Sequence, residues 1–316
     1  MEEGAPKVRR LTAGEEDSGQ RLDNFLFRTL KGVPQSHVYR LLRTGQVRVN
    51  GRRVKPDYRL ESGDELRLPP VRQEEKPAPG LPPRWQQEAL QGAILFEDER
   101  LLVVNKPAGM AVHGGSGVAF GVIETLRQLR PEARSLELAH RLDRETSGCL
   151  ILAKRRSALR ALHAAFREGR VEKRYLALLD GSWSGGERSV DVPLEKNRLQ
   201  GGERMVKVGG AGKRSESIFR PLRKFQAATL AEVQILTGRT HQIRVHAAHL
   251  GHPVAGDDKY GDREANKRFK AAGLKRMFLH AHTLVFEHPE SGAYLQLTAP
   301  LDGELEALLE RLGEAV

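Results

Sequence analysis

The segment "AHRLDRETSG", residues 139–148, places one carboxylate between two arginines and therefore could hold a reacting group. Asp143 follows Arg141 by two positions and directly precedes Arg144, and a second acid, Glu145, lies two residues further on. Neighbouring arginines favour the charged form of a carboxylate, which a nucleophile or a base requires. Clusters of mixed charge are more often solvated ion pairs that do no chemistry, so the flanking residues decide between these interpretations.

Apolar runs on both sides predict that this segment is a short loop between two buried strands. The run "LELA", residues 136–139, precedes it, and "CLILAK", residues 149–154, follows it, with Thr-Ser-Gly at 146–148 supplying turn chemistry. Functional groups favour loops of this kind, because a rigid sheet fixes them while the loop exposes them. A glycosidase-like pair is discounted, since Asp143 and Glu145 do not come from different elements facing each other across a sugar.

A second stretch contains residue types that could take part in catalysis, namely "LTGRTHQIRVHAAHLGHPVAGDDKYGD", residues 236–262. Thr240 is expected to cap a helix that carries Arg244, and a buried arginine needs an acid partner, for which Asp143 is a candidate. The stretch also contains four histidines, His241, His246, His249 and His252. Their spacing lacks the i, i+4 pattern with an adjacent acid that zinc-binding helices use, so no metal site is expected.

A glycine-rich loop, "NKPAGMAVHGGSGVAFG" at residues 105–121, follows another predicted strand. It contains neither Gly-Lys-Ser/Thr nor G-x-G-x-x-G between a strand and a helix, so it is a weak candidate for a nucleotide-phosphate cradle. The glycines instead favour a backbone that lets another chain approach closely. His113 in this loop is an expected RNA contact.

The chain is predicted to have two domains joined by a linker. Six of the 16 prolines fall between Leu68 and Pro83, in a segment that can neither pair in a sheet nor continue a helix. The predicted boundaries are an amino-terminal extension at 1–17, a small domain at 18–75, a proline-rich linker at 76–91 and a large domain at 92–316.

The small domain combines two short helices, a hairpin and a strongly basic surface. Apolar residues at helical spacing predict helices in "QRLDNFLFRTLKG" and "SHVYRLLRTG", and Asn50-Gly51 predicts a type I′ turn in "VRVNGRRV". Between Arg21 and Arg59 the sequence has ten Lys/Arg and two acids, which favours phosphate binding over a merely solvated face. The expected RNA-binding residues are Arg40, Arg43, Arg48, Arg52 and Arg53.

The large domain is predicted to be α+β, with a large mixed, mostly antiparallel sheet and flanking helices. Strand patterns recur at 94–96, 101–105, 136–141, 149–153, 174–179, 227–236, 278–286 and 293–298. Helical periodicity occurs at 121–129, 157–168, 240–250 and 303–312. Because strands and helices do not alternate strictly, a doubly wound parallel sheet is not expected.

Composition narrows the class of protein and of partner. The 316 residues carry a formal charge of +11, from 52 basic against 41 acidic residues, which indicates a polyanionic partner or an acidic membrane. No run of 18 apolar residues and no signal-peptide core occurs, so a cytoplasmic protein is expected. The single cysteine, Cys149, rules out an internal disulfide and predicts a buried structural thiol.

Four motifs together resemble a known family. "NKPAGMAVH", "HRLDRETSG", "KRYLALLDG" and "GRTHQIRVHAAHLGHPVAGDDKYG" occur in the order found in the RluA-type pseudouridine synthases. The small domain, with two helices and then "GQVRVNGRRV", resembles the S4 RNA-binding domain, which precedes the catalytic domain in the large-subunit enzymes. The resemblance runs over nearly the whole chain.

This resemblance implies a pseudouridine synthase fold and the isomerisation of specific uridines in 23S ribosomal RNA. The expected partner is 23S ribosomal RNA or a large-subunit assembly intermediate, and the protein is expected to be a monomer. The N1–C1′ bond is cut, the uracil turns, and C5 is joined to C1′, with neither cofactor nor metal. The family's catalytic aspartate falls on Asp143, its base-stacking tyrosine on Tyr175 and its aspartate-pairing arginine on Arg244. Arg141 falls beside the site, at a position where the family has a residue that helps to fill the space left by an extruded nucleotide.

Two other functions remain as alternatives. A non-catalytic RNA-binding ribosome-assembly factor of the same fold would use both domains only to hold RNA. An RNA methyltransferase is disfavoured, because no strand-linked glycine fingerprint is present. Whether Asp143 attacks the sugar covalently or assists elimination through a glycal is left open.

Overall fold

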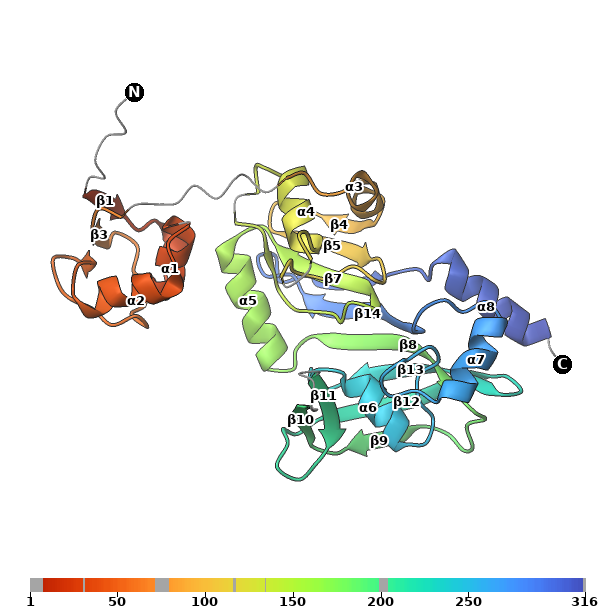
Figure 1. Cartoon of the computed structure of the whole chain (residues 1–316). Helices are drawn as coiled ribbons and strands as arrows, with labels where there is room; N and C mark the ends of the chain where they lie inside the picture. Colours follow the sequence, from red (N-terminus) through yellow and green to blue (C-terminus); the bar gives the residue numbers. More distant parts are fainter. Residues whose placement is uncertain are drawn as a thin grey trace. The chain divides into compact units, whose positions relative to one another are not determined.

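The chain forms two compact units, residues 1–81 and residues 82–316 (Figure 1). This is a computed structural model, and the residues that it describes are 8–30, 32–71, 80–115, 118–133, 135–198 and 204–314. Each unit has its own hydrophobic core. Within these ranges none of the helices combines the length and the hydrophobicity that a membrane span requires.

The first unit packs two helices against a three-stranded sheet. Its elements are β1 (Arg9–Thr12), a 3-10 turn (Glu15–Asp17), α1 (Leu22–Thr29), α2 (Gln35–Arg43), β2 (Arg48–Val49) and β3 (Glu65–Leu68), with strand order β1-β3-β2. The apolar residues expected to face inward are buried, namely Leu22, Phe25, Leu26, Leu30, Val38, Leu41 and Leu42. The predicted hairpin turn is also confirmed, because φ is +49° at Asn50 and +74° at Gly51.

Two parts of the predicted domain plan differ from the structure. The extension predicted at 1–17 contributes β1, which pairs antiparallel with β3. This strand was not predicted, because it is held by backbone hydrogen bonds and its sequence, RRLT, lacks an apolar strand pattern. The linker predicted at 76–91 ends in helix α3 (Arg84–Gln91), whose Leu90 is fully buried in the core of the second unit. Pro83 sits at the amino-terminal cap, where proline does not interrupt a helix. Residues 72–79 lie outside the described residues.

One ten-stranded sheet organises the second unit, in the order β4-β5-β7-β14-β8-β13-β12-β9, with β15 on β14 and β6 on β7. The strands are β4 (Ile94–Glu97), β5 (Leu101–Lys106), β6 (Glu137–Leu138), β7 (Ser147–Ala153), β8 (Glu172–Asp180), β9 (Arg188–Asp191), β12 (Glu216–Lys224), β13 (Ala228–Ile235), β14 (Leu279–Glu287) and β15 (Tyr294–Thr298). Within this sheet β7 and β14 pair in parallel, whereas the other pairs are antiparallel. The predicted α+β class with a mostly antiparallel sheet is therefore confirmed.

Helices and a separate hairpin surround this sheet (Figure 1). They are α3, α4 (Val122–Leu129), α5 (Arg156–Arg167), α6 (Gln242–His249), α7 (Arg263–Ala271), α8 (Gly303–Glu314) and the hairpin β10 (Leu194–Arg198) with β11 (Arg204–Val208). Strand β5 is buried on both faces, since Leu102 and Val104 pack in one core cluster and Leu101 and Val103 in another. A strand held from both sides is a rigid support for the loops at its ends.

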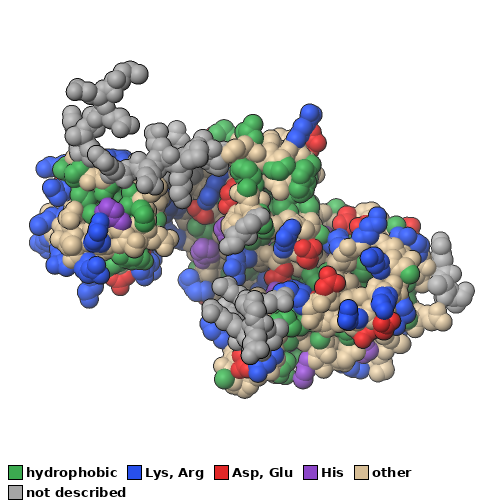
Figure 2. Space-filling model, in the orientation of Figure 1, with side chains coloured by type: hydrophobic (Ala, Val, Ile, Leu, Met, Phe, Trp, Pro, Cys, Tyr) green, Lys and Arg blue, Asp and Glu red, His purple; other side chains and the backbone are tan. Residues whose placement is uncertain are grey.

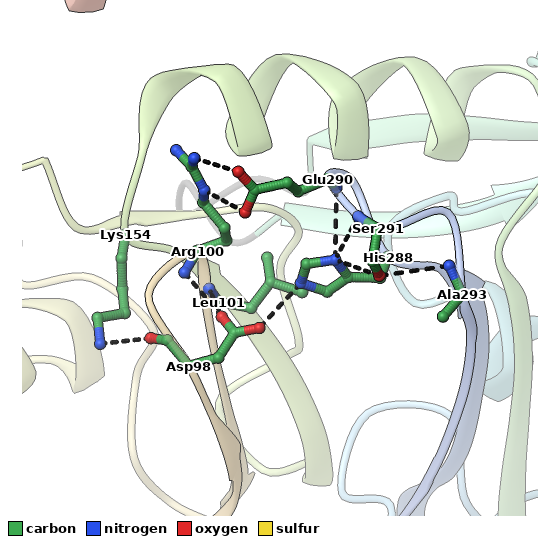
Figure 3. A network of polar contacts seen from close by, with 8 residues as sticks. All are labelled: Asp98, Arg100, Leu101, Lys154, His288, Glu290, Ser291 and Ala293. Carbon is green, nitrogen blue, oxygen red and sulfur yellow. Dashed lines mark hydrogen bonds and ion pairs between the residues drawn. The ribbon is translucent and has the colours of Figure 1, made fainter.

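A polar network surrounds Asp98 in the turn between β4 and β5 (Figure 3). The Asp98 carboxylate accepts hydrogen bonds from the backbone N–H groups of Arg100 and Leu101, each at 2.7 Å, and lies 2.9 Å from Nε2 of His288. The Asp98 carbonyl accepts from Lys154 at 2.6 Å. His288 follows β14 and Lys154 follows β7, so one carboxylate residue connects the ends of three strand segments.

Candidate active site

The loop that carries Asp143 connects β6 to β7, as the sequence predicted, and backbone groups hold it in place. The ammonium nitrogen of Lys106, a fully buried side chain, lies 3.0 Å from the carbonyl oxygen of Arg144 and within 2.9 Å of the carbonyls of Pro107 and Met110. Burial lowers the pKa of Lys106 to about 7. Three carbonyl acceptors nevertheless need three N–H donors, so the ammonium form fits this geometry.

The other end of the loop is fixed where β7 meets β14. Gly148 has φ +110°, and a Cβ there would collide with the backbone of Ala281. Any side chain would push the parallel strands apart directly beside the loop. Asp143 itself stays partly accessible, with 29% of its side chain exposed.

Arg244 on α6 faces two carboxylates at once. Its Nη1 lies 3.6 Å from Oδ2 of Asp143, which is the ion pair expected from the sequence. Its Nε and Nη2 each donate to Asp257 at 2.7 Å, forming a bidentate pair that the sequence reasoning missed. Arg244 is 7% exposed and Asp257 1% exposed. The guanidinium fork is thus fixed by one acid and directed towards the other.

The charge state of this pair follows from its surroundings. Burial opposes the charged form of Asp257, but the hydrogen bonds and charge of Arg244 outweigh it and hold the pKa of Asp257 below its ordinary value of 3.8. Burial also opposes the charge of Arg244, yet Asp257 and Asp143 together raise the pKa of the guanidinium. The acidic pair Asp257-Asp258 after the helix was the available sequence signal for this partner.

Tyr175 on β8 lines the same cavity as Asp143. It lies opposite Val233 of β13 in the sheet and is 9% exposed. Burial, followed by the charge of Asp143, raises the pKa of the Tyr175 hydroxyl, so the phenol is neutral at physiological pH. Within the described part of the chain no group hydrogen-bonds this hydroxyl, which leaves it available to a bound molecule.

His241 and Tyr260 complete the surroundings of Asp143, and neither was assigned a role from the sequence. Nε2 of His241 lies 3.9 Å from Oδ2 of Asp143, and its Nδ1 lies 2.8 Å from the Tyr260 hydroxyl. The guanidinium carbon of Arg244 sits 5.0 Å from the centre of the Tyr260 ring. His241, rather than the predicted Thr240, occupies the amino-terminal cap of α6.

The cavity that these side chains share has a volume of about 1100 Å³ and an excess of positive charge. Six basic and two acidic residues line it, namely Arg141, Arg167, Lys173, Arg239, Arg244 and Lys259 against Asp143 and Glu168. Its size is that of a site for a nucleotide-sized ligand, and its charge suits a polyanion. The described residues contain no group of three His, Cys, Asp or Glu side chains arranged to hold a metal ion.

The structure brings only part of the predicted RNA-binding set to this cavity. Arg141 is exposed and lines it. His113 is exposed, but its neighbour Val112, rather than His113 itself, lines the cavity. The remaining five lie in the first unit, where Figure 2 shows Lys and Arg side chains spread over the visible face. Each is exposed, and none forms an ion pair with a described residue: Arg40, Arg43, Arg48, Arg52 and Arg53.

Comparison with known families and proteins agrees with this arrangement. The family model for RNA pseudouridylate synthase matches residues 100–249, and the S4 domain model matches residues 20–66. The first match contains the Asp143 loop, Tyr175 and the whole of α6. The second contains both helices and the turn of the first unit.

Curated relatives match over the full chain. Ribosomal large subunit pseudouridine synthase C of Salmonella typhi is 53% identical over 99% of this chain and 99% of its own length. The protein of the same name from Escherichia coli strain K12 is 52% identical over the whole of both chains. That of Pasteurella multocida is 53% identical over 97% of this chain and 94% of its own.

Solved structures share the fold of the second unit. Human RNA Pseudouridylate Synthase Domain Containing 4 superposes with a TM-score of 0.60 at 27% identity, over 72% of this chain and 95% of its own. Human RNA Pseudouridylate Synthase Domain Containing 1 superposes with a TM-score of 0.56 at 27% identity, over 71% of this chain and 95% of its own. With half of its residues identical to full-length relatives and the motifs gathered around one cavity, the chain belongs to the RNA pseudouridylate synthase family and carries an S4 domain before the catalytic unit.

Proposed function

We propose that this protein converts specific uridines of 23S ribosomal RNA to pseudouridine. The observation that carries the proposal is Asp143, an accessible carboxylate set in a cationic cavity of nucleotide size and paired there with Arg244. The curated relatives described above are named for the large ribosomal subunit, which gives the substrate class.

In this proposal Asp143 is the carboxylate that acts at the ribose when the N1–C1′ bond breaks. The uracil turns within the cavity, C5 bonds to C1′, the C5 proton leaves, and N1 carries a proton in the product, so the reaction is redox-neutral. A uridine in folded RNA must leave its stack before this carboxylate can reach it. Arg244 orients Asp143, because its other two nitrogens are fixed by Asp257.

Tyr175 is the proposed stacking residue for the extruded uracil. Its ring lines the cavity, and stacking of a base on an aromatic ring contributes about 1–3 kcal/mol. Its hydroxyl, neutral and unbonded by described residues, remains available for a proton-transfer role. Arg141 is proposed to occupy the space that the extruded nucleotide leaves in the RNA.

The proposal also covers RNA binding by the first unit, the oligomeric state and the form of the RNA substrate. The five exposed arginines of the S4 domain would bind RNA phosphates, and His113 would contact RNA beside the cavity. The protein is proposed to act as a monomer, because Asp143, Tyr175 and Arg244 meet in one cavity within a single catalytic unit. Its substrate would be 23S RNA, free or within an assembly intermediate, in the cytoplasm where that RNA is made.

The experiment is to map pseudouridines in 23S RNA from cells with and without this gene. The proposal expects specific uridines to lose the modification on deletion and to regain it when purified protein is added to the unmodified RNA. A non-catalytic assembly factor would leave every pseudouridine in place while altering subunit assembly. That result would replace the proposal with the binding-only alternative.

A further inference from the structure

The backbone of His241 is in a conformation that side chains other than glycine rarely adopt. Its φ is +54° and ψ +21°, in the left-handed region, and it is alone among the described non-glycine residues of the catalytic unit in having a positive φ. A residue held there costs about 1–2 kcal/mol, and asparagine tolerates the region better than histidine. Glycine would adopt this backbone conformation without that cost. A histidine in this position at the cavity wall therefore indicates a role for its side chain.

The hydrogen bonds of Tyr260 favour one tautomer of the His241 ring. The Tyr260 hydroxyl oxygen accepts the backbone N–H of Val206 at 2.9 Å, and we assign its own hydrogen to Nδ1 of His241, 2.8 Å away. A neutral imidazole that accepts at Nδ1 carries its hydrogen on Nε2. Burial lowers the pKa of His241, although the charge of Asp143 works in the opposite direction, and this favours the neutral ring.

The Nε2–H group faces Oδ2 of Asp143, the same oxygen that faces Arg244. The distances are 3.9 Å from His241 and 3.6 Å from Arg244. Both exceed hydrogen-bond length, and catalytic hydrogen bonds commonly tighten once substrate is bound. No described residue bonds Oδ1 of Asp143, so this oxygen remains free for the ribose.

We propose that His241 is a positioning residue for Asp143, donating through Nε2–H to Oδ2 so that Oδ1 is directed at the bound ribose, with Tyr260 acting only through His241. This inference rests on the proposed function, because it concerns the orientation of the carboxylate in that reaction. Nothing in it requires a change in RNA affinity.

Two substitutions of His241 separate a side-chain role from a backbone role. The amide nitrogen of His241→Gln can reach the position of Nε2, whereas His241→Asn places its amide near Nδ1 but suits the left-handed backbone better. The assay is single-turnover pseudouridine formation in transcribed 23S RNA, with RNA affinity and melting temperature measured in parallel. His249→Gln, an exposed position on the same helix, is the matched control.

The proposal expects the Gln variant to react within about tenfold of wild type and the Asn variant to be slower by about 100-fold, both with RNA affinity near that of wild type. Asn as fast as Gln, or faster, would overturn it, since backbone preference predicts that order. Failure of the wild-type protein to form pseudouridine would instead refute the proposed function, so the two failures are distinguishable.

A mutant cycle with Tyr260→Phe tests the connection between the two rings. Phe keeps the ring beside Arg244 but removes the hydroxyl that fixes the His241 tautomer. In the wild-type background we expect a slower reaction, and in the His241→Gln background no further loss, because the hydroxyl then has no imidazole to orient. Equal losses in both backgrounds would contradict the proposal and give Tyr260 a role independent of His241.

Discussion

Replacing Asp257 with asparagine tests whether the bidentate pair with Arg244 supports both the fold and the site. Oδ1 of Asp257 accepts from Nη2 of Arg244 and from the backbone N–H groups of Lys259 and Tyr260, while Oδ2 accepts from Nε of Arg244. Asparagine can keep its oxygen at the first position. Its amide would then face the Nε–H of Arg244, donor against donor, and the guanidinium would keep only the Asp143 carboxylate, 3.6 Å away, as its counter-charge.

The magnitude follows from burial. Removing one partner of a buried ion pair costs about 3–5 kcal/mol, and the bonds that asparagine retains place this variant near 3 kcal/mol. For a catalytic unit of this size the corresponding decrease in melting temperature is about 6–12 °C. Asp258→Asn is the matched control, because that neighbouring carboxylate is exposed, and we expect its effect to stay within about 0.5 kcal/mol.

The difference in the free energy of unfolding between wild type and Asp257→Asn should also depend on pH in a defined direction. The pKa of Asp257 is lowered below 3.8 in the folded protein, so its stabilising effect is fully present above that value and is lost as the pH falls through the folded pKa. The gap between wild type and Asp257→Asn is therefore constant near neutral pH and shrinks below about pH 3.8. Urea unfolding over a pH series measures it. A gap under 1 kcal/mol at neutral pH, or one that widens in acid, would refute this reasoning.

Three further predictions concern the site and its RNA contacts. Tyr175→Phe should bind RNA and keep some activity, whereas Tyr175→Ala should lose most turnover with the lost stacking of about 1–3 kcal/mol; equal inactivity in single-turnover assays would place the hydroxyl in the chemistry. Arg40→Gln combined with Arg43→Gln should reduce the salt slope of RNA binding by about 1.5, and an unchanged slope would mean a merely solvated face. Lys106→Met should leave one buried and two partly buried carbonyls without this donor and destabilise the protein by about 3 kcal/mol in urea unfolding, whereas the same substitution of an exposed lysine should have little effect.

The parts of the fold that the sequence predicted well are those with strong apolar periodicity. The buried runs around 101–105 and 149–153 became β5 and β7. Residues 139–146 of "AHRLDRETSG" form the predicted loop between strands, while Ser147 and Gly148 already belong to β7. Both helices of the S4 domain likewise follow apolar residues at helical spacing. In these segments burial alone selects the structure, so the pattern is sufficient.

The missed elements are polar or depend on partners distant in the chain. Strand β12, "ESIFRPLRK", contains Pro221 and a register shift beside it, and the hairpin β10–β11 is short and charged. Helix α7, "REANKRFKA", has few apolar residues, although Asp262 caps it through the backbone N–H of Ala265. Such segments take their structure from tertiary contacts that a periodic pattern does not encode.

Within the site, the sequence identified residue types but not their pairing. It associated Arg244 with Asp143, yet Asp257 supplies the closer bidentate contact because the turn after α6 returns the chain to the helix. Nothing in the sequence marks the left-handed backbone of His241, because histidine adopts this region only at a minority of its positions. Geometry of this kind depends on the whole fold and is found only once the structure is in hand.

Pseudouridine formation by Asp143→Asn tests the central claim most directly. Asparagine keeps the shape of the side chain but removes the charge that acts at the ribose. We predict that this variant folds and binds 23S RNA with wild-type affinity yet forms no detectable pseudouridine, whereas Glu145→Gln, altered at an exposed acid of the same loop, remains active. Pseudouridine formed by Asp143→Asn at a rate near that of wild type would contradict the claim and reduce the cluster to an ion pair worth about 0–1 kcal/mol.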